Sequence, residues 1–401
     1  MRFRWTRGRH SAPGAISVVA VMLMLPVQTG CVVHARALPA IVRRDTVWYV
    51  SARARHDGRA RRALADSLEY GAAIFEYAPV RDPFTDALPS GLRDSLRLTR
   101  DAFLTALRAR GASQTAPDDF TVVYVHGFGT GLGECWSQPF AARVRSQSAA
   151  PWVAFCWPSH GAGVTWPRTG SLVVRAYEDD TAAVTASAPA FRRVLTEVTG
   201  TLGASRVVLA AHSLGGRLVG EALLQSEATD PAWSNNTRLR AIAFLALDHD
   251  AARFGDTIVP VLRSRAERLV LYTSRRDRAL GISRRVHDTP RAGLAEPTPL
   301  RRAGLETVDM TDALAADGWW QRLVGNRHSI RRASVAVWDL THVVGGAYAA
   351  WCRDTVGVGR QVADGSWRLL AGRRPDTTRL ARCSPFVPTD RAPSSSAGAS
   401  R

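Results

Sequence analysis

The most informative stretch of this chain is Arg206–Gly216, which reads RVVLAAHSLGG. Apolar residues with strand character lead into Ser213 and its small neighbours, and a helix-like pattern follows from Gly216 to Leu224. This order is typical of a nucleophile elbow, in which a serine lies on a strained turn beside a helix N-terminus. Ala211 stands where the G-x-S-x-G pattern has its first glycine, which is the mildest possible change. The alternative interpretation is an ordinary turn with a capping serine.

A second informative stretch is Phe120–Gly129, FTVVYVHGFG, in which an apolar run ends at His126-Gly127. The spacing from His126 to Ser213 leaves room for a helix, a strand at Pro151–Trp157 and another helix. Together, the two stretches resemble the α/β-hydrolase superfamily. The third strand of that fold ends in a turn that helps to form the oxyanion hole, and its fifth strand ends in the nucleophile elbow.

The chain more narrowly resembles an uncharacterised bacterial esterase/lipase-like branch of this superfamily, in an exported or lipoprotein form. The resemblance covers roughly Thr46 to Gly346 and rests on four short motifs considered as a set. These motifs are Trp157-Pro158-Ser159, Ala211-His212-Ser213, Tyr272–Leu280 (YTSRRDRAL) and Arg327-His328-Ser329.

Strand and helix patterns alternate from Phe120 onward. We expect strands at 120–126, 152–157, 206–212, 239–247, 268–274 and 305–310, and helices near 132–146, 174–198, 214–226, 251–265 and 329–344. This alternation predicts an α/β fold, a mostly parallel central sheet with helices on both faces. Before it, we expect strands at Thr46–Ala52 and Tyr70–Val80, separated by an arginine-rich loop around His56, and then a helix at Leu92–Arg110.

The N-terminus has the features of a bacterial export signal. Four arginines precede a short apolar core at Ala15–Val27, and Thr29-Gly30-Cys31 follows it. Cys31 is the expected lipidation site, although Gln28 stands where a lipobox prefers leucine. Ordinary cleavage nearby and an uncleaved anchor are the alternatives. We therefore expect the protein in the bacterial cell envelope, in the periplasm or at the outer membrane, attached to the membrane by an N-terminal lipid.

This interpretation divides the chain into five parts. They are a lipoprotein-type signal peptide at 1–30, a linker at 31–45, an α/β-hydrolase domain at 46–350, a C-terminal extension at 351–387 and a disordered tail at 388–401.

The formal charge of +18 invites a nucleic-acid interpretation, but all 53 basic residues are arginine. The arginines are dispersed among acidic residues, and no aromatic-basic binding motif occurs, so we expect no nucleic-acid partner. Removal of residues 1–30 takes away four arginines and no acid, which leaves +14. That charge suits contact with anionic envelope surfaces.

Four cysteines follow Cys31, and an even number in an exported chain permits disulfides. Cys352–Cys383 is the favoured pair because it would staple the C-terminal extension. Cys156 lies in a predicted buried strand, where an inert apolar cysteine is the default. No C-x-x-C or histidine-rich spacing indicates a metal, and no cofactor is implied.

A serine nucleophile needs a histidine base and a carboxylate, and in this superfamily both follow the serine in the chain. Asp277 is the favoured acid because it follows the predicted strand Arg268–Ser274, the usual position of the superfamily's acid. Asp248 is the reserve acid, at the end of the preceding strand together with Asp250. The alternative for Asp277 is a surface carboxylate paired with neighbouring arginines.

Among the histidines, His328 is the favoured base because it precedes the helix-like stretch Ser329–Val344. His342 is the reserve, but it lies within that helical pattern, and His287 comes before the last strand. His126 and His212 flank the two key turns and are expected to shape the site. The oxyanion hole should come from the backbone amides of Phe128 and Leu214.

These residues predict a serine hydrolase that cleaves a carboxylic ester or a related acyl bond through an acyl-enzyme. Its substrate would be a small acyl or lipid-like molecule, and the oligomeric state is left open. One alternative is a non-catalytic envelope lipoprotein on the same fold, because a fold does not fix a function. The other is an amidase, thioesterase or acyltransferase on this scaffold.

Overall fold

The computed structural model describes residues 42–56, 59–79, 82, 88, 90–115, 119–160, 170–229, 238–316, 328 and 334–386. Contacts divide the chain into residues 1–37 and 38–401, and all described residues belong to the second unit. The predicted signal peptide, Cys31 and the predicted tail lie outside the described residues. Within the described part, no helix has both the length and the apolar character needed to cross a membrane.

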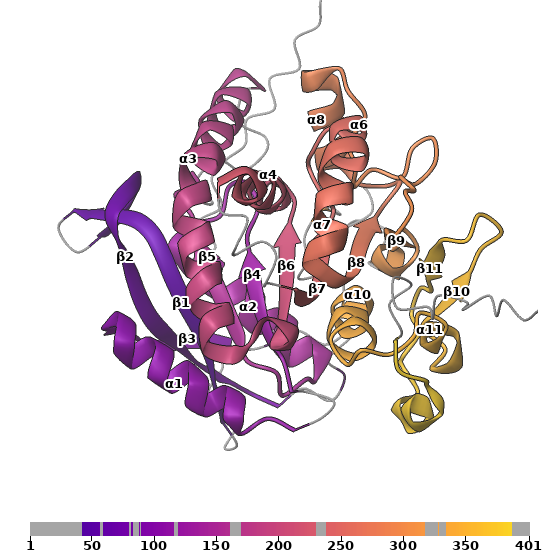
Figure 1. Cartoon of the computed structure of the whole chain (residues 1–401), viewed down its shortest axis with the longest axis horizontal. Helices are drawn as coiled ribbons and strands as arrows, with labels where there is room; N and C mark the ends of the chain where they lie inside the picture. Colours follow the sequence, from indigo (N-terminus) through magenta and orange to yellow (C-terminus); the bar gives the residue numbers. More distant parts are fainter. Residues whose placement is uncertain are drawn as a thin grey trace, which may run out of the picture. The chain divides into compact units, whose positions relative to one another are not determined.

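A single sheet of eleven strands runs through the described part of the chain (Figure 1). Its strands are β1 (Arg43–His56), β2 (Arg59–Tyr77), β3 (Ser90–Leu98), β4 (Thr121–Val125), β5 (Trp152–Cys156), β6 (Val207–His212), β7 (Leu239–Leu245), β8 (Ala266–Thr273), β9 (Glu306–Asp309), β10 (Gly359–Gln361) and β11 (Trp367–Leu369). Their order in the sheet is β10-β11-β9-β8-β7-β6-β4-β5-β1-β2-β3. Every neighbouring pair from β11 to β1 is parallel, and β2, β3 and β10 pair antiparallel. The predicted mostly parallel sheet is therefore confirmed.

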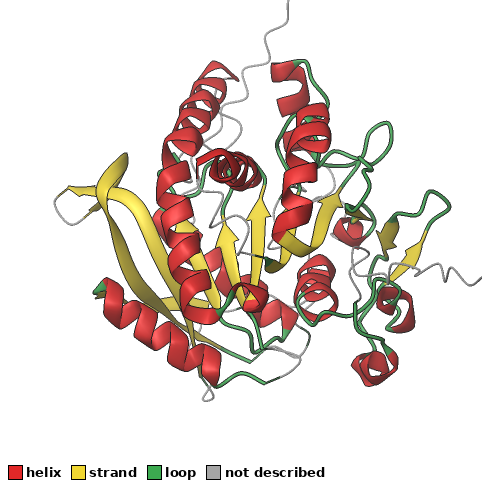
Figure 2. Ribbon diagram, viewed as in Figure 1, coloured by secondary structure: helices red, strands yellow, loops and turns green. Residues whose placement is uncertain are grey.

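Helices lie on both faces of the central strands, as Figure 2 shows. The α-helices of the described residues are α1 (Arg100–Ala112), α2 (Leu132–Ser146), α3 (Gly170–Leu202), α4 (Leu214–Thr229), α6 (Ala251–Arg253), α7 (Val259–Arg265), α8 (Arg278–His287), α10 (Ser334–Asp339) and α11 (Cys352–Thr355). Short 3-10 segments occupy Ala204–Arg206, Ala313–Ala316 and Thr377–Arg382, and π-helical turns occupy Phe254–Ile258 and Leu340–Val344.

Alternate side chains of each central strand enter different cores, because successive residues of a strand point to opposite faces. In β6, Val207, Leu209 and Ala211 belong to the core that includes residues of α1, α3, α4 and α7. Val208 and Ala210 belong to the core that includes α10. Strands buried on both faces have no polar side, which explains the continuous apolar runs in the sequence.

The N-terminal strands differ from the prediction. β1 and β2 are much longer than expected and continue into the stretch around His56 that was expected to be a loop. The predicted helix at Leu92–Arg110 is wrong in its first part, where β3 forms the edge of the sheet, and α1 begins only at Arg100.

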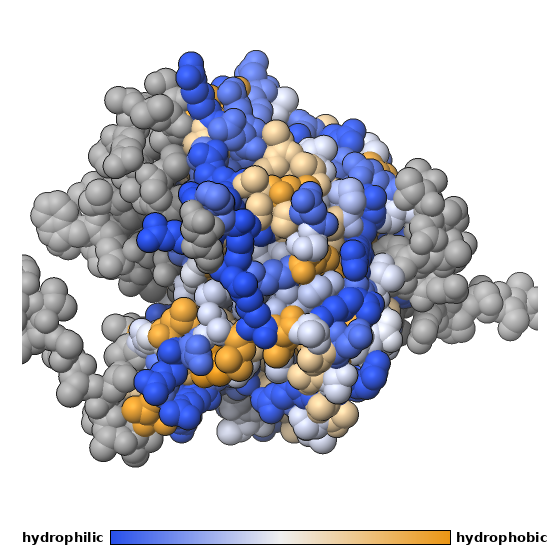
Figure 3. Space-filling model, turned by 90° about the vertical axis from the view of Figure 1, so that its left-hand side faces the viewer, coloured by the Kyte–Doolittle hydropathy of each residue, from blue (hydrophilic) through white to orange (hydrophobic). Residues whose placement is uncertain are grey.

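The physical reason is that β3 buries little. Leu92 and Leu96 are 48% and 45% exposed, so their spacing reflects no helical core face. Backbone pairing with β2 holds this segment as a strand instead. Figure 3 shows the side of the molecule that carries these strands, where groups of hydrophobic residues lie among hydrophilic ones.

Two disulfides join the four cysteines that follow Cys31. The predicted Cys352–Cys383 pair is confirmed. The expectation of an inert Cys156 is wrong, because Cys156 bonds to Cys135. Cys135 lies in the first turn of α2 and Cys156 ends the next strand, β5. A helix that packs antiparallel to the following strand brings these two ends together, here at a Cα–Cα distance of 5.8 Å.

Further elements were not predicted from the sequence, among them β10, β11, α8 and α11. β10 and β11 extend the sheet beyond β9, and α8 follows β8 directly after Asp277. α10 and its π-helical turn occupy residues 334–344 of the expected helix, and 329–333 lie outside the described residues.

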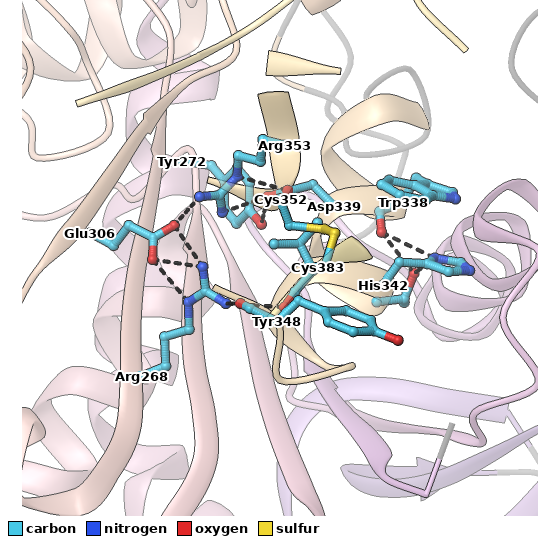
Figure 4. A network of polar contacts seen from close by, with 12 residues as sticks. Arg268, Tyr272, Glu306, Trp338, Asp339, His342, Tyr348, Cys352, Arg353 and Cys383 are labelled. Carbon is cyan, nitrogen blue, oxygen red and sulfur yellow. Dashed lines mark hydrogen bonds and ion pairs between the residues drawn. A yellow bond between two sulfur atoms is a disulfide. The ribbon is translucent and has the colours of Figure 1, made fainter. Parts of the chain in front are cut away.

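A buried network of charges connects this C-terminal region with the sheet (Figure 4). The fully buried Arg353 guanidinium donates to both carboxylate oxygens of Asp339 on α10, at 2.8 and 2.9 Å. It also contacts Glu306 of β9, which in turn accepts hydrogen bonds from Arg268 of β8 at 2.9 and 3.0 Å. Tyr272 of β8 donates to Asp339 at 2.7 Å.

Candidate active site

Ser213 lies at the turn between β6 and α4, at the centre of the parallel strands. Its φ of +53° is in the left-handed region, which is strained for a residue with a side chain. The turn is fixed by backbone hydrogen bonds: the Ser213 N–H donates to Leu245 O at 2.9 Å, and its carbonyl accepts from Gly216 N at 2.9 Å. This is the geometry expected of a nucleophile elbow.

Small residues let the turn after β4 lie directly against this elbow. A Cβ on Gly215 would lie 2.2 Å from the His126 carbonyl oxygen, and one on Gly127 would lie 2.9 Å from Ser213 Cβ. The His126-Gly127-Phe128 turn is therefore adjacent to Ser213. The structure thus brings Phe128 and Leu214, the expected oxyanion positions, to the two turns that meet at this serine.

The structure joins Ser213, His328 and Asp277 in one chain of hydrogen bonds. The Ser213 hydroxyl lies 2.6 Å from His328 Nε2, and His328 Nδ1 lies 2.7 Å from Asp277 Oδ2. With Nδ1–H donating to the carboxylate, Nε2 carries the lone pair that accepts the hydrogen bond of the serine hydroxyl. Of the three residues selected from the sequence, His328 thus contacts both Ser213 and Asp277, in the expected order.

Asp277 is held in place by the start of α8. It is the N-cap of that helix, and its second oxygen, Oδ1, accepts the Leu280 N–H at 3.0 Å. Its side chain is fully buried. Burial alone would disfavour the charged form of His328, but attraction to Asp277 and the hydrogen bond to it raise the pKa of His328 above its ordinary value.

The reserve acid Asp248 belongs to a different, buried cluster. Its carboxylate accepts hydrogen bonds from Arg291 Nε at 2.8 Å, from the Ser283 hydroxyl at 2.7 Å and from the Tyr177 hydroxyl at 2.7 Å. These partners occupy both oxygens. Asp250 caps α6 through a bond from Arg253 N at 2.7 Å.

The reserve base His342 also lies elsewhere. Its ring stacks on Trp338 with centroids 4.5 Å apart, and Nδ1 lies 3.2 Å from the Trp338 carbonyl. His287 lies in another place, with its ring tilted against that of Tyr177 and the centroids 5.5 Å apart.

The two histidines beside the key turns contact the backbone of the site. His212 Nε2 donates to the His328 carbonyl at 2.6 Å, and the two rings lie 4.8 Å apart. His126 stacks on Trp157, whose indole N–H donates to the His126 carbonyl at 2.8 Å. Burial lowers the pKa of both histidines to about 3, so both are neutral near pH 7.

Asp180 of α3 is a supporting residue that the sequence reasoning missed. Its buried carboxylate accepts from the Ser159 hydroxyl at 2.5 Å, from His160 N at 2.9 Å and from Gly129 N at 3.3 Å. It thereby connects α3 with the turn after β4. Nothing in the acidic run Glu178-Asp179-Asp180 distinguishes the buried member from its exposed neighbours. Among the described residues, no cluster of three or more histidine, cysteine, aspartate or glutamate side chains could hold a metal ion.

Comparisons with solved structures give distant similarities. The chain is 13% identical to the hormone-sensitive-lipase homologue EstE7 from a metagenome library, over 68% of this chain and 82% of that one, with a TM-score of 0.30. It is 12% identical to an esterase/lipase from an uncultured bacterium, over 76% and 86% of the two chains, with a TM-score of 0.30. It is 11% identical to the carboxylesterase EstE1 from a metagenomic library, over 75% of this chain and 89% of that one, with a TM-score of 0.25. A search of curated proteins found no match.

A family model described as "Alpha/beta hydrolase of unknown function (DUF900)" matches residues 105–321, more than half of the chain. The matched region contains β4, β6, the elbow and Asp277. This chain therefore belongs to that alpha/beta hydrolase family.

Proposed function

We propose that the protein is a serine hydrolase that cleaves a carboxylic ester or a related acyl bond through an acyl-enzyme. One observation carries the proposal: Ser213 on its strained elbow, His328 and Asp277 form an unbroken chain of hydrogen bonds of 2.6 and 2.7 Å. A serine hydroxyl becomes an effective nucleophile when such a base and acid are in place.

The first half of the reaction forms the acyl-enzyme. Ser213 Oγ attacks the acyl carbon while its proton passes to His328 Nε2, and Asp277 stabilises the resulting imidazolium. The backbone amides of Phe128 and Leu214 bind the negative oxygen of the tetrahedral intermediate. The carbon–oxygen bond to the leaving alcohol then breaks, and the alcohol takes the proton from His328.

The second half repeats these steps with water. His328 removes a proton from a water molecule, the hydroxide attacks the acyl-enzyme, and Ser213 leaves with the proton returned by His328. The free acid is released and the enzyme regains its starting protonation state.

A fluorophosphonate probe tests the proposal without a known substrate. We expect covalent labelling of the purified protein, mapped by mass spectrometry to Ser213 and abolished in Ser213→Ala. Hydrolysis of short p-nitrophenyl esters, compared with matched thioesters and anilides, then identifies the acyl bond. An adduct on another serine, or esterase activity that survives Ser213→Ala, would refute the assignment.

We also propose that the protein is exported and carries lipid on Cys31, so that it resides in the cell envelope. The basic and apolar N-terminus supports this, and so do two disulfides, which persist mainly in oxidising compartments. The mature N-terminus, determined by mass spectrometry of the protein from its native host, should be a lipidated Cys31. A mature chain that starts elsewhere without lipid would contradict the proposal.

A further inference from the structure

A cavity of about 530 Å³ opens beside the candidate catalytic acid, and arginines dominate its wall. Asp277 itself belongs to this wall, together with five arginines. They are Arg275, Arg276, Arg278, Arg284 and Arg285. The wall of the cavity thus includes the residue that contacts His328, the partner of Ser213.

The segment that supplies these arginines is much richer in arginine than the chain as a whole. Five of the eleven residues from 275 to 285 are arginine, whereas the whole chain has 53 in 401 residues. Among the described residues that line the cavity, the acidic ones are Glu296 and Asp277, whose carboxylate is buried against His328, so the formal charge of the lining is +3. Like charges this close repel one another, so the arrangement favours an anion between them.

Two of these arginines have no acidic partner in the described part of the chain. Arg275 lies 3.6 Å from Asp309, and Arg284 lies 3.3 Å from Glu296. For Arg276 and Arg285, both exposed on this wall, no described carboxylate lies within ion-pair distance. A planar guanidinium without a partner is suited to bind a carboxylate or a phosphate through paired hydrogen bonds.

The same wall also has an apolar part, formed by Ile282 and Leu294. Ile282 is 38% exposed, although a residue of this kind is usually buried. A ligand that combines an anionic group with a hydrocarbon segment would satisfy both parts of the wall.

We propose that this cavity, here named the arginine pocket, binds an anionic group of the substrate, so that the enzyme prefers acyl esters that carry a carboxylate or a phosphate. The inference rests on the proposed function, because the pocket adjoins the acid of that site. The anion would lie against Arg276 and Arg285, and the hydrocarbon segment against Ile282 and Leu294.

Two matched esters test the preference. Mono-(4-nitrophenyl) glutarate carries a free carboxylate, and its methyl ester is neutral but otherwise the same. We expect a higher kcat/KM for the anionic ester, and a preference that weakens as salt screens the arginines. In Arg276→Gln/Arg285→Gln, kcat/KM for the anionic ester should fall by about tenfold, with little change for the neutral ester.

The control variant is Arg108→Gln/Arg110→Gln on α1, which removes the same charge from exposed positions outside the pocket. In this control variant, kcat/KM should be unchanged for both esters. Arg276→Lys/Arg285→Lys, which keeps the charge, should recover part of the preference. An equal loss of kcat/KM for both esters would overturn the proposal, because it would indicate general damage to the enzyme. The same loss of kcat/KM for the anionic ester in the α1 control would also overturn it, because it would indicate attraction to the overall positive charge.

A binding measurement separates this proposal from the proposed function. Calorimetric titration of the wild-type protein with inorganic phosphate should show binding that is lost in Arg276→Gln/Arg285→Gln and kept in the α1 control. Phosphate should also inhibit hydrolysis of the anionic ester competitively. If neither ester is cleaved but phosphate binding depends on these arginines, the catalytic proposal fails and the anion site stands. If esters are cleaved but phosphate does not bind and the anionic ester is not preferred, the pocket proposal fails alone.

Discussion

At Asp277, one carboxylate has two separate tasks. Oδ1 caps α8, and Oδ2 contacts His328. In Asp277→Asn, the amide oxygen can still cap the helix, but the amide cannot stabilise an imidazolium and favours the wrong tautomer of His328. We expect kcat for a short p-nitrophenyl ester to fall by about 10⁴-fold, with the melting temperature nearly unchanged.

The opposite result is expected at Asp248. Its carboxylate balances the buried Arg291 guanidinium, so Asp248→Asn should lower the melting temperature while kcat per folded molecule changes little. A variant pair in which Asp248→Asn loses catalysis and Asp277→Asn retains it would mean that the acid comes from the end of β7.

In the proposed mechanism, the raised pKa of His328 should set the acidic limb of the pH profile. Only neutral His328 can accept the Ser213 proton, so activity declines as the pH falls through this pKa. Because the attraction of Asp277 raises it, the limb in kcat/KM should lie above pH 6.5, the ordinary value for histidine. Asp277→Asn should move the limb to lower pH in its residual activity. A limb at the same pH in both proteins would show that Asp277 does not act on His328.

At the scale of single residues, the sequence allows prediction of those site residues that follow a strand. Ser213, Asp277 and His328 could be selected because the chain order of the superfamily and the ends of predicted strands restrict the choice. Asp180 could not, because it lies inside a helix whose buried face includes one member of an acidic run. Its importance depends on the tertiary contact with Gly129 and Ser159, which no local pattern encodes.

At the scale of elements, the contact between α4 and the turn after β4 depends on the missing side chain of Gly215. In Gly215→Ala, the new Cβ would meet the His126 carbonyl at 2.2 Å, a backbone atom that cannot rotate away. We expect a loss of about 1–3 kcal/mol in the free energy of unfolding. The displaced turn should also lower kcat, because it carries the Phe128 amide.

The matched control for this variant is Gly200→Ala on α3. A Cβ there would meet no atom within 4 Å, so the variant should be neutral or stabilised by about 0.5–1 kcal/mol. Urea denaturation of both variants, together with ester hydrolysis, checks the pair. If the two variants had the same free energy of unfolding and the same kcat, the elbow would tolerate a side chain at Gly215.

Prediction of elements succeeded where strands are buried on both faces and failed at the edges of the sheet. The apolar runs at β4, β5 and β6 identify the strands almost to the residue. At β3 nearly all side chains are exposed, and β10 and β11 have only three residues each, so pairing with a neighbouring strand determines the structure there. The Cys135–Cys156 bond escaped prediction for a related reason, since it depends on how α2 packs over β5.

At the scale of the whole molecule, the C-terminal segment shares the core of the sheet. β10 and β11 continue the sheet order, Cys352 bonds to Cys383, and Arg353 lies buried between α10 and β9. Attraction to Asp339 and Glu306 outweighs the cost of burial and raises the pKa of Arg353 above its ordinary value. Stability therefore depends on a fully paired set of buried charges, in which each member is costly when its partner is lost.

Arg353→Met tests this dependence, because it leaves Asp339 buried without its cation. We expect a loss of about 3–5 kcal/mol in the free energy of unfolding, measured by urea denaturation. Arg353→Met/Asp339→Leu removes both charges and should lose less than the single variant, since apolar side chains of similar size can replace a buried pair. The control is Arg379→Met, whose partner Asp376 is exposed, and it should change stability by less than about 1 kcal/mol. If the double variant is instead as unstable as the sum of its single variants, the two charges do not act as a pair, and this ion pair does not account for the stability of the C-terminal segment.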